Sequence, residues 1–90
     1  MKTTLELLDK AKDKAAPLSE RQLSMQLGHS PTALKQARTR GNVSPILAGQ
    51  LAEMLGENVE HWIAVAAIEA QPRSRVTDHL RRTITAMQRL

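Results

Sequence analysis

Cysteine is absent from this chain of 90 residues. Its absence excludes a disulfide framework and every zinc site that depends on thiolate ligands. A chain without cysteine suits a reducing compartment, so we expect a cytoplasmic protein. Long hydrophobic runs are also absent, because charges interrupt the apolar positions of the first ten residues and no later apolar run is long enough to cross a bilayer. We therefore expect neither a signal peptide nor a transmembrane segment.

Aromatic residues are nearly absent, because Trp62 is the only one and neither Phe nor Tyr occurs. The core must therefore consist of aliphatic side chains, and we expect Trp62 to pack among them rather than to stack on a ligand. Alternating runs of β-branched residues, which predict strands, are missing too. Since alanine and leucine favour helices, these observations predict an all-α protein.

Acidic residues are absent from residues 21–52, which carry Arg21, Lys35, Arg38 and Arg40. Residues 53–72 show the reverse, with four glutamates and no base, and residues 73–90 carry five arginines against Asp78. The net charge of +4 is therefore divided into a basic stretch, an acidic stretch and a basic end. A basic face needs an anionic partner, and nucleic acid is the first candidate.

Two short helices joined by a tight corner are predicted within residues 19–40. Ser19 and Gln22 have the spacing of a capping box, which begins the first of them. Gly28 ends that helix, because glycine readily adopts the positive φ of a helix C-terminus. Ser30 is expected to cap the second helix by accepting a backbone N–H.

The second helix is expected to begin at Pro31, because the first helical position does not need an N–H donor. It ends before Gly41, so it covers residues 31–40. Leu34 and Ala37 should face inward. The residues left facing outward are Thr32, Lys35, Gln36, Thr39 and Arg40.

Three further helices follow from capping residues and prolines. One begins at Thr3 and ends at Pro17, another lies between Ser44 and Gly56, and a third is capped by Asn58 and covers residues 59–70. The helix after Ser44 is expected to be mostly buried, through Ile46, Leu47, Leu51, Ala52, Met54 and Leu55. The inner stripe of the helix at 59–70 is expected to comprise Val59, Trp62, Ile63, Ala66, Ala67 and Ala70.

Residues from Arg73 onward predict a sixth helix with one apolar face, formed by Val76, Leu80, Ile84 and Met87. This face must be buried against the domain or against a second subunit. Three interpretations of the arginine-rich segment stay open: a dimerisation helix, a second contact to a DNA backbone, or an extension with little order. Binding to an anionic membrane ranks last, because the face has no aromatic anchor.

A pattern of small and apolar residues carries further information. It consists of Leu23, Ser24, Leu27, Gly28, Ser30 and Leu34, followed by Ser44, Pro45 and residues 50–56. The pattern resembles the helix-turn-helix domain of the phage-repressor family (Cro/cI-like, also called XRE-like), over roughly residues 5–70. The resemblance implies a five-helix lambda-repressor-like domain over residues 1–71, with an additional basic helix or tail over residues 72–90. His29 departs from the family, which usually has an apolar residue there.

The resemblance also implies DNA contacts by specific residues, with the helix at 31–40 in the major groove. The implied base-reading residues are Pro31, Thr32, Lys35 and Gln36. The implied phosphate-binding residues are Gln22, Ser30, Arg38, Arg40 and Asn42, with Arg21 as a weaker candidate.

Simpler interpretations of several of these residues stay open. Gln22 is also explained by its capping box, and Asn42 by a turn with positive φ. Lys35, Arg38 and Arg40 are also what an ordinary solvated helix face contains, although the lack of acid over residues 21–52 favours DNA.

No group of residues indicates catalysis or metal binding. His29, His61 and His79 have no ligand spacing, and the chain has no glycine-rich phosphate loop and no paired nucleophile and base. We therefore expect no metal, no cofactor and no enzyme activity.

The function that best fits these observations is a sequence-specific regulator of transcription that binds double-stranded DNA. We expect a repressor of phage or mobile-element character. It should act as a homodimer, with residues 73–90 as the candidate interface, because one recognition helix covers only half of a two-fold site. The alternatives are a protein-interaction module on the same fold, such as an antitoxin-like or phage accessory protein, and a nucleoid-type binder without sequence preference.

Overall fold

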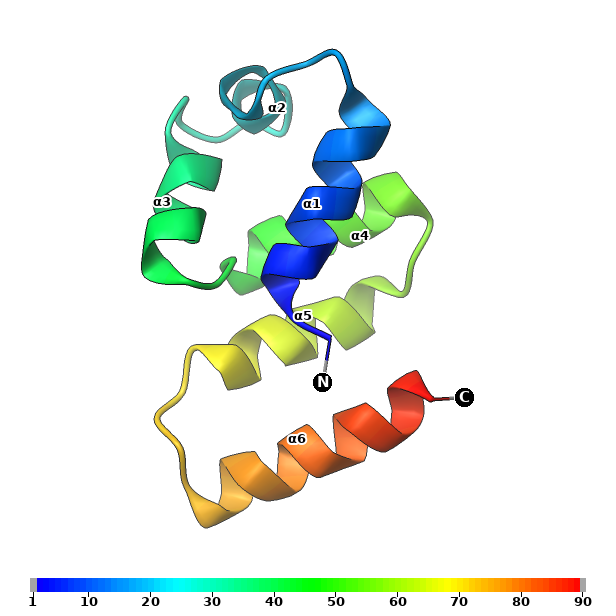
Figure 1. Cartoon of the computed structure of the whole chain (residues 1–90). Coiled ribbons are helices and arrows are strands. Elements are labelled where there is room, and N and C mark those ends of the chain that lie inside the picture. The colour runs from blue at the N-terminus through cyan, green and yellow to red at the C-terminus, as the bar shows by residue number, and fades with distance from the viewer. Residues whose placement is uncertain (1, 90) are drawn as a thin grey trace.

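A computed structural model describes residues 2–89. Met1, in the predicted region 1–71, and Leu90, in the predicted region 72–90, lie outside the described residues. The described chain contains six helices and no strand, which confirms the all-α class (Figure 1). The helices are α1 (Thr4–Ala15), α2 (Glu20–Gln26), α3 (Ala33–Arg40), α4 (Pro45–Leu55), α5 (Val59–Glu69) and α6 (Arg75–Gln88). None of these helices of residues 2–89 has both the length and the apolar character needed to cross a bilayer.

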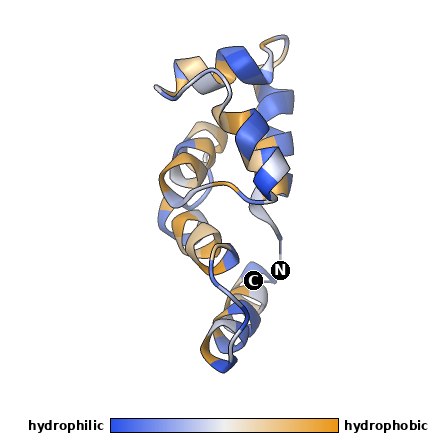
Figure 2. Ribbon diagram, turned by 90° about the vertical axis from the view of Figure 1, so that its left-hand side faces the viewer, coloured by the Kyte–Doolittle hydropathy of each residue, from blue (hydrophilic) through white to orange (hydrophobic). Residues whose placement is uncertain are grey.

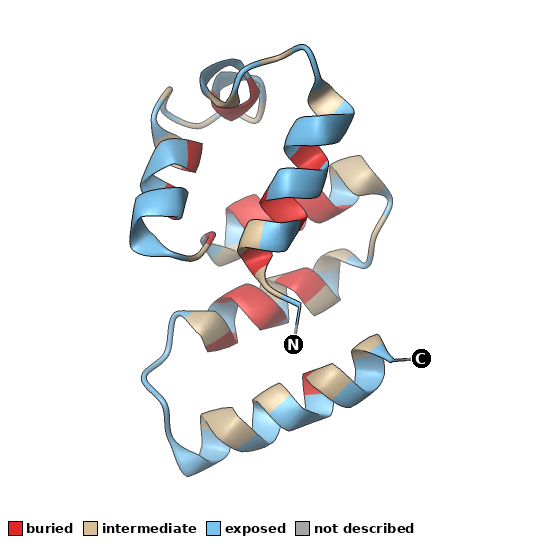
Figure 3. Ribbon diagram, viewed as in Figure 1, coloured by how far each residue is buried: buried red, intermediate tan, exposed pale blue. Residues whose placement is uncertain are grey.

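The core lies where α1, α4 and α5 meet, and Figures 2 and 3 show hydrophobic and buried residues concentrated in the middle of the molecule. It is aliphatic apart from Trp62, which is buried and donates its indole N–H to Glu57 Oε1 at 3.0 Å. The expected core position of Trp62 is confirmed. Helices α4 and α5 approach closely at Gly49, where an added Cβ would lie 3.0 Å from Ile63 Cδ1.

Most of the predicted helix ends are confirmed. Ser19 and Gln22 form the capping box, with Gln22 N donating to Ser19 Oγ at 3.1 Å and Ser19 N to Gln22 Oε1 at 2.9 Å. Thr3 and Asn58 accept backbone N–H groups at the starts of α1 and α5. Gly28 has a φ of +83°, as its role in the corner requires.

The predicted start of α3 is wrong by two residues. Its N-cap is Thr32 rather than Ser30, and no side chain of its own segment caps it. The amide of Ala33 donates to the Ser30 carbonyl at 3.1 Å, which closes a turn over Pro31 and Thr32 before the helix begins. Ser30 therefore starts a turn and does not cap a helix.

The predicted inward faces of α4 and α5 need correction. Ile46 was expected to be buried and is 68% exposed. On α5, Ala67 and Ala70 are exposed, whereas Val65 and Ile68 are buried. The buried face of α5 follows residues 62, 65 and 66, and Ile63 is half-buried beside Gly49 of α4. Positions 67 and 70 turn outward, where alanine loses little by exposure.

Helix α6 forms as predicted, but it does not bury the face expected from its pattern. Ile84 is buried, whereas Val76, Leu80 and Met87 are 68%, 40% and 52% exposed. Polar groups hold α6 in place instead. Gln88 Oε1 accepts from the Lys2 amide at 2.9 Å, and Arg81 Nη2 donates weakly to the Ile68 carbonyl at 3.5 Å.

A buried hydroxyl joins three segments that are distant in the sequence. Thr4 Oγ1 donates to Glu69 Oε1 at 2.5 Å and accepts from the Val43 amide at 2.9 Å. The Thr4 amide donates to the other carboxylate oxygen at 2.9 Å. Thr4 and Val43 are fully buried, so the start of α1, the end of α5 and the α3–α4 loop share one satisfied polar group.

This hydroxyl is expected to contribute measurably to stability. Thr4→Val keeps the shape of the side chain but leaves the Val43 amide without its acceptor, so the free energy of unfolding should fall by about 1–3 kcal/mol. Urea unfolding followed by circular dichroism measures the change. Thr4→Ser is the control, because it retains the hydroxyl. Equal stability of Thr4→Val and the parent would show that this network does not hold the fold together.

Candidate nucleic-acid interface

The orientation of α3 relative to α2 is set by the side chain of Ser24. Its hydroxyl is buried, donates to the Glu20 carbonyl at 2.8 Å and accepts from the Leu34 amide at 3.2 Å. Leu34 is the second residue of α3, and its N–H has no carbonyl partner within its own helix. A residue of α2 therefore caps α3, and this cap compensates for the missing one at Thr32.

The turn between α2 and α3 is held by Gln50 of α4. Its Oε1 lies 2.5 Å from His29 Nε2, and its Nε2 donates to the Leu27 carbonyl at 3.0 Å. An amide oxygen only accepts, so His29 carries its proton on Nε2 in this contact. The unusual histidine in the turn thus has a packing role that sequence reasoning missed, because its partner lies 21 residues away.

The outward face of α3 brings together the residues implied to read bases. Leu34 and Ala37 are buried, as predicted, and the opposite side of the helix is exposed (Figure 3). A shallow groove of about 390 Å³ on this side is lined by Thr32, Lys35, Gln36, Thr39 and Arg40. Pro31 is half-buried and shares a neighbouring hollow with Thr32, Lys35 and Arg21. All four implied base-reading residues therefore lie at the start of α3 or on its outer face.

The implied phosphate-binding residues are arranged less uniformly. Arg40 and Asn42 lie together, because Arg40 Nε donates to Asn42 Oδ1 at 2.9 Å and Nη2 donates to the Asn42 carbonyl at 3.1 Å. Gln22 uses only its oxygen in the capping box, which leaves its Nε2 donors for another acceptor. Ser30 is exposed at the corner, with its carbonyl used by the turn.

Arg38 points away from this group and toward α1 and α2. Its Nη2 lies 2.7 Å from Asp9 Oδ1, and its Nε is ion-paired with Glu20. The hydrogen bond to Asp9, and to a smaller extent the hydrogen bond to Glu20, raise the pKa of the guanidinium above its usual value. The raised pKa keeps Arg38 charged until strongly alkaline pH, so the contribution of these pairs to stability is not lost by titration of the arginine near neutrality.

The outer face of α3 keeps its positive charge. Lys35 and Arg40 are exposed and form no ion pair with any of the residues 2–89. Glu20 borders the hollow that contains Pro31 and Lys35, and its carboxylate is ion-paired with Arg38. The groove on the outer face of α3 therefore offers cationic and amide donors and is lined by no carboxylate, which is a suitable arrangement for an anionic partner.

The cap supplied by Ser24 leads to a matched pair of substitutions. Ser24→Ala removes the acceptor of the Leu34 amide, so the free energy of unfolding should fall by about 1–2 kcal/mol. Ser30→Ala should change it by less than about 0.5 kcal/mol, because the Ser30 hydroxyl does not cap α3. Urea unfolding measures both, and hydrogen exchange should show faster exchange of the Leu34 amide in Ser24→Ala alone. A larger loss in Ser30→Ala than in Ser24→Ala would contradict the observed cap.

Among residues 2–89, no three His, Cys, Asp or Glu side chains come together as metal ligands would. Comparisons with protein-family models, curated proteins and solved structures give no match to this chain. What the surface of α3 binds must therefore follow from its own charges, exposed groups and hydrogen bonds.

Proposed function

We propose that this chain binds double-stranded DNA by placing α3 in the major groove, and that it regulates transcription in this way. In this proposal α2 and α3 are the helix-turn-helix unit of a five-helix, phage-repressor-like domain of the Cro/cI type. The observation that supports it most is the exposed outer face of α3, where Lys35 and Arg40 have no acidic partner within residues 2–89. The centre of a protein–protein interface is usually depleted of lysine and other charged residues, unlike this face.

Base recognition would depend on the turn before α3 and on the first turn of the helix. Gln36 has the geometry to pair with N6 and N7 of adenine, and Lys35 can reach O6 and N7 of guanine. The methyl group of Thr32 or the ring of Pro31 would contact a thymine methyl. In the unbound chain Gln36 Nε2 donates to Thr32 Oγ1 at 3.3 Å, a long bond that an adenine can replace at small cost.

Phosphate contacts would flank the groove on both sides. Gln22 and Ser30 lie at the α2 side, and Arg40 and Asn42 lie where α3 ends. Arg38 would have to leave Asp9 and Glu20 to reach a phosphate, so we expect it to position α3 rather than to bind the backbone directly. Contacts of this kind fix the register of the protein on the duplex without reading sequence.

A homodimer is part of the proposal, with α6 as the interface. The stripe formed by Val76, Leu80 and Met87 follows one face of α6, and each of its side chains keeps 40–68% of its surface exposed. Two copies joined through this stripe would present two α3 helices to a two-fold operator. The same stripe also suits a different protein, which is the observation that favours an antitoxin-like or accessory module as the second candidate.

The first experiment is a selection from random duplexes at two salt concentrations. A two-fold motif that is enriched and survives the higher salt is the expected result. Binding that falls steeply with salt and shows no preference would indicate a nucleoid-type protein instead. Retention of no DNA at either salt would reject the proposal and favour the protein-interaction module.

The groove assignment predicts different effects for two substitutions. Gln36→Ala should cost about 1–3 kcal/mol on the selected site and relax its sequence preference, because it removes a base contact. Arg40→Ala should weaken binding to all duplexes alike and lower the salt dependence, because it removes a phosphate contact. Fluorescence anisotropy with selected and scrambled duplexes measures both. Unchanged binding of both variants to every duplex would show that α3 does not enter the groove.

The dimer assignment predicts that Leu80→Glu is monomeric, because a charge in the middle of the apolar stripe cannot be buried without a partner. Sedimentation velocity measures the association state. Ala64→Glu places the same charge on an exposed position of α5 and should leave the dimer intact. A parent chain that sediments as a monomer at all concentrations, with or without DNA, would exclude this interface.

A further inference from the structure

A groove of about 750 Å³ lies between α6, the start of α1 and the loop that joins α3 to α4. Four arginines line it, one before α6, two on α6 and one directly after it: Arg73, Arg81, Arg82 and Arg89. Thr3 and Asn42 lie on the opposite side. The volume falls in the range of sites that bind small molecules, roughly 300–1,000 Å³.

The groove is positively charged even after its acids are counted. Four arginines against Glu69 and Asp78 leave a net charge of +2. Both carboxylates are already engaged, Glu69 by Thr4 and Asp78 by Arg73 Nε at 2.7 Å. The positive groups on α6 are therefore only partly compensated.

Arg81 has more donors than partners. Its Nε is buried without a hydrogen-bond partner among residues 2–89, and its Nη2 makes only the 3.5 Å contact to the Ile68 carbonyl. Arg82 is exposed beside it and has no ion pair within the same residues. A guanidinium group carries five donors, so Arg82 and the terminal nitrogens of Arg81 leave several donors for an outside acceptor, whereas the buried Nε of Arg81 is not accessible to one.

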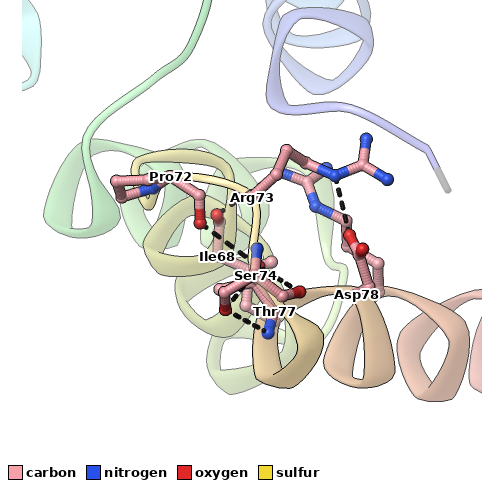
Figure 4. A network of polar contacts seen from close by, with 7 residues as sticks. Ile68, Pro72, Arg73, Ser74, Thr77 and Asp78 are labelled. Carbon is pink, nitrogen blue, oxygen red and sulfur yellow. Dashed lines mark hydrogen bonds and ion pairs between the residues drawn. The ribbon is translucent and has the colours of Figure 1, made fainter.

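Both ends of α6, which carries two of the arginines of the groove, are held by hydrogen bonds. Ser74 and Thr77 form a capping box at the start of α6, and Thr77 Oγ1 also donates to the Pro72 carbonyl at 3.2 Å (Figure 4). At the other end Gln88 is bonded to Lys2 and lies 3.1 Å from His61 Nε2. The backbone that carries Arg81 and Arg82 is therefore in place before binding, which lowers the cost of ordering the site.

We propose that this groove binds phosphate groups, with Arg81 and Arg82 as their main donors. Planar guanidinium groups bind phosphate oxygens in pairs of parallel hydrogen bonds, and a net charge of +2 suits a ligand with two or more negative charges. The phosphate can belong to a small phosphorylated molecule or to the backbone of a duplex beside α3, because Asn42 borders both the groove and the end of α3. Binding of a small phosphorylated molecule does not rest on the proposed function.

The first arm of the test uses inorganic pyrophosphate and the full chain, titrated at constant ionic strength and followed by NMR of the backbone amides. Shifts are expected at Asn42, Arg82 and Thr85. Arg82→Gln should weaken pyrophosphate binding roughly fivefold to tenfold, as expected for the loss of charged hydrogen bonds at an exposed site. Arg75→Gln is the matched control, since it removes the same charge from α6 without lining the groove, and it should change binding by less than about twofold.

The second arm measures duplex binding of the same variants over a range of salt concentrations. A backbone phosphate in the groove predicts that Arg82→Gln lowers the slope of log K against log salt by about 1 and that pyrophosphate competes with DNA. A small phosphorylated ligand predicts pyrophosphate binding in the first arm and no effect of Arg82→Gln on duplexes. Either result assigns the groove to phosphate.

The proposal is overturned if Arg82→Gln and Arg75→Gln behave alike in both arms. It is also overturned if pyrophosphate shifts no amide of the groove and the slope for duplexes stays that of the parent. If the phosphate proposal for the groove is rejected in this way, the expected effect of Gln36→Ala on DNA binding still stands. Conversely, a chain that binds pyrophosphate but no duplex would reject DNA binding by α3 and keep the groove, so the two proposals fail separately.

Discussion

The hydroxyl of Ser24 determines where α3 points. Helix α3 has no cap of its own, and the Leu34 amide at its start is satisfied from α2 at 3.2 Å. Two further contacts also hold α3 in this orientation: Gln50 bonds to the turn before it, and Arg38 connects α3 to α1 and α2. These contacts are made by side chains that face the protein. These contacts therefore fix the position of α3 without covering its outer face.

Most features that depend on neighbouring residues were predictable from the sequence, whereas side-chain contacts between residues distant in the sequence were not. The capping box at Ser19 and the positive φ of Gly28 are local, and both were predicted correctly. Ser30 and Pro31 together are typical of a helix start, but the Ser30 carbonyl accepts from the Ala33 amide in a turn, and the helix begins only after that turn. The pairing of Arg38 with Asp9 spans 29 residues, and no local pattern indicates which outward arginine has a carboxylate nearby.

In helix α6 the predicted apolar face is present, but most of it is not buried against the domain. Its pattern predicts an apolar face, and that face exists, but α6 contacts the rest of the chain mainly through Arg81, Gln88 and Ile84. The helix therefore has two surfaces that the domain does not use, an apolar stripe on one side and a cationic groove on another. A segment that contributes little to the core can serve as an attachment for partners of two different chemistries.

The single aromatic side chain has a practical consequence. Trp62 is buried and its indole N–H is bonded to Glu57 within the same part of the molecule, whereas the polar face of α3 contains no fluorophore. Intrinsic emission of this protein therefore originates from one site in the core. A change in that emission reports that the core has opened or rearranged. Binding of a partner to α3 alone should leave the emission unchanged. Tryptophan fluorescence can therefore distinguish unfolding of this protein from binding at its surface.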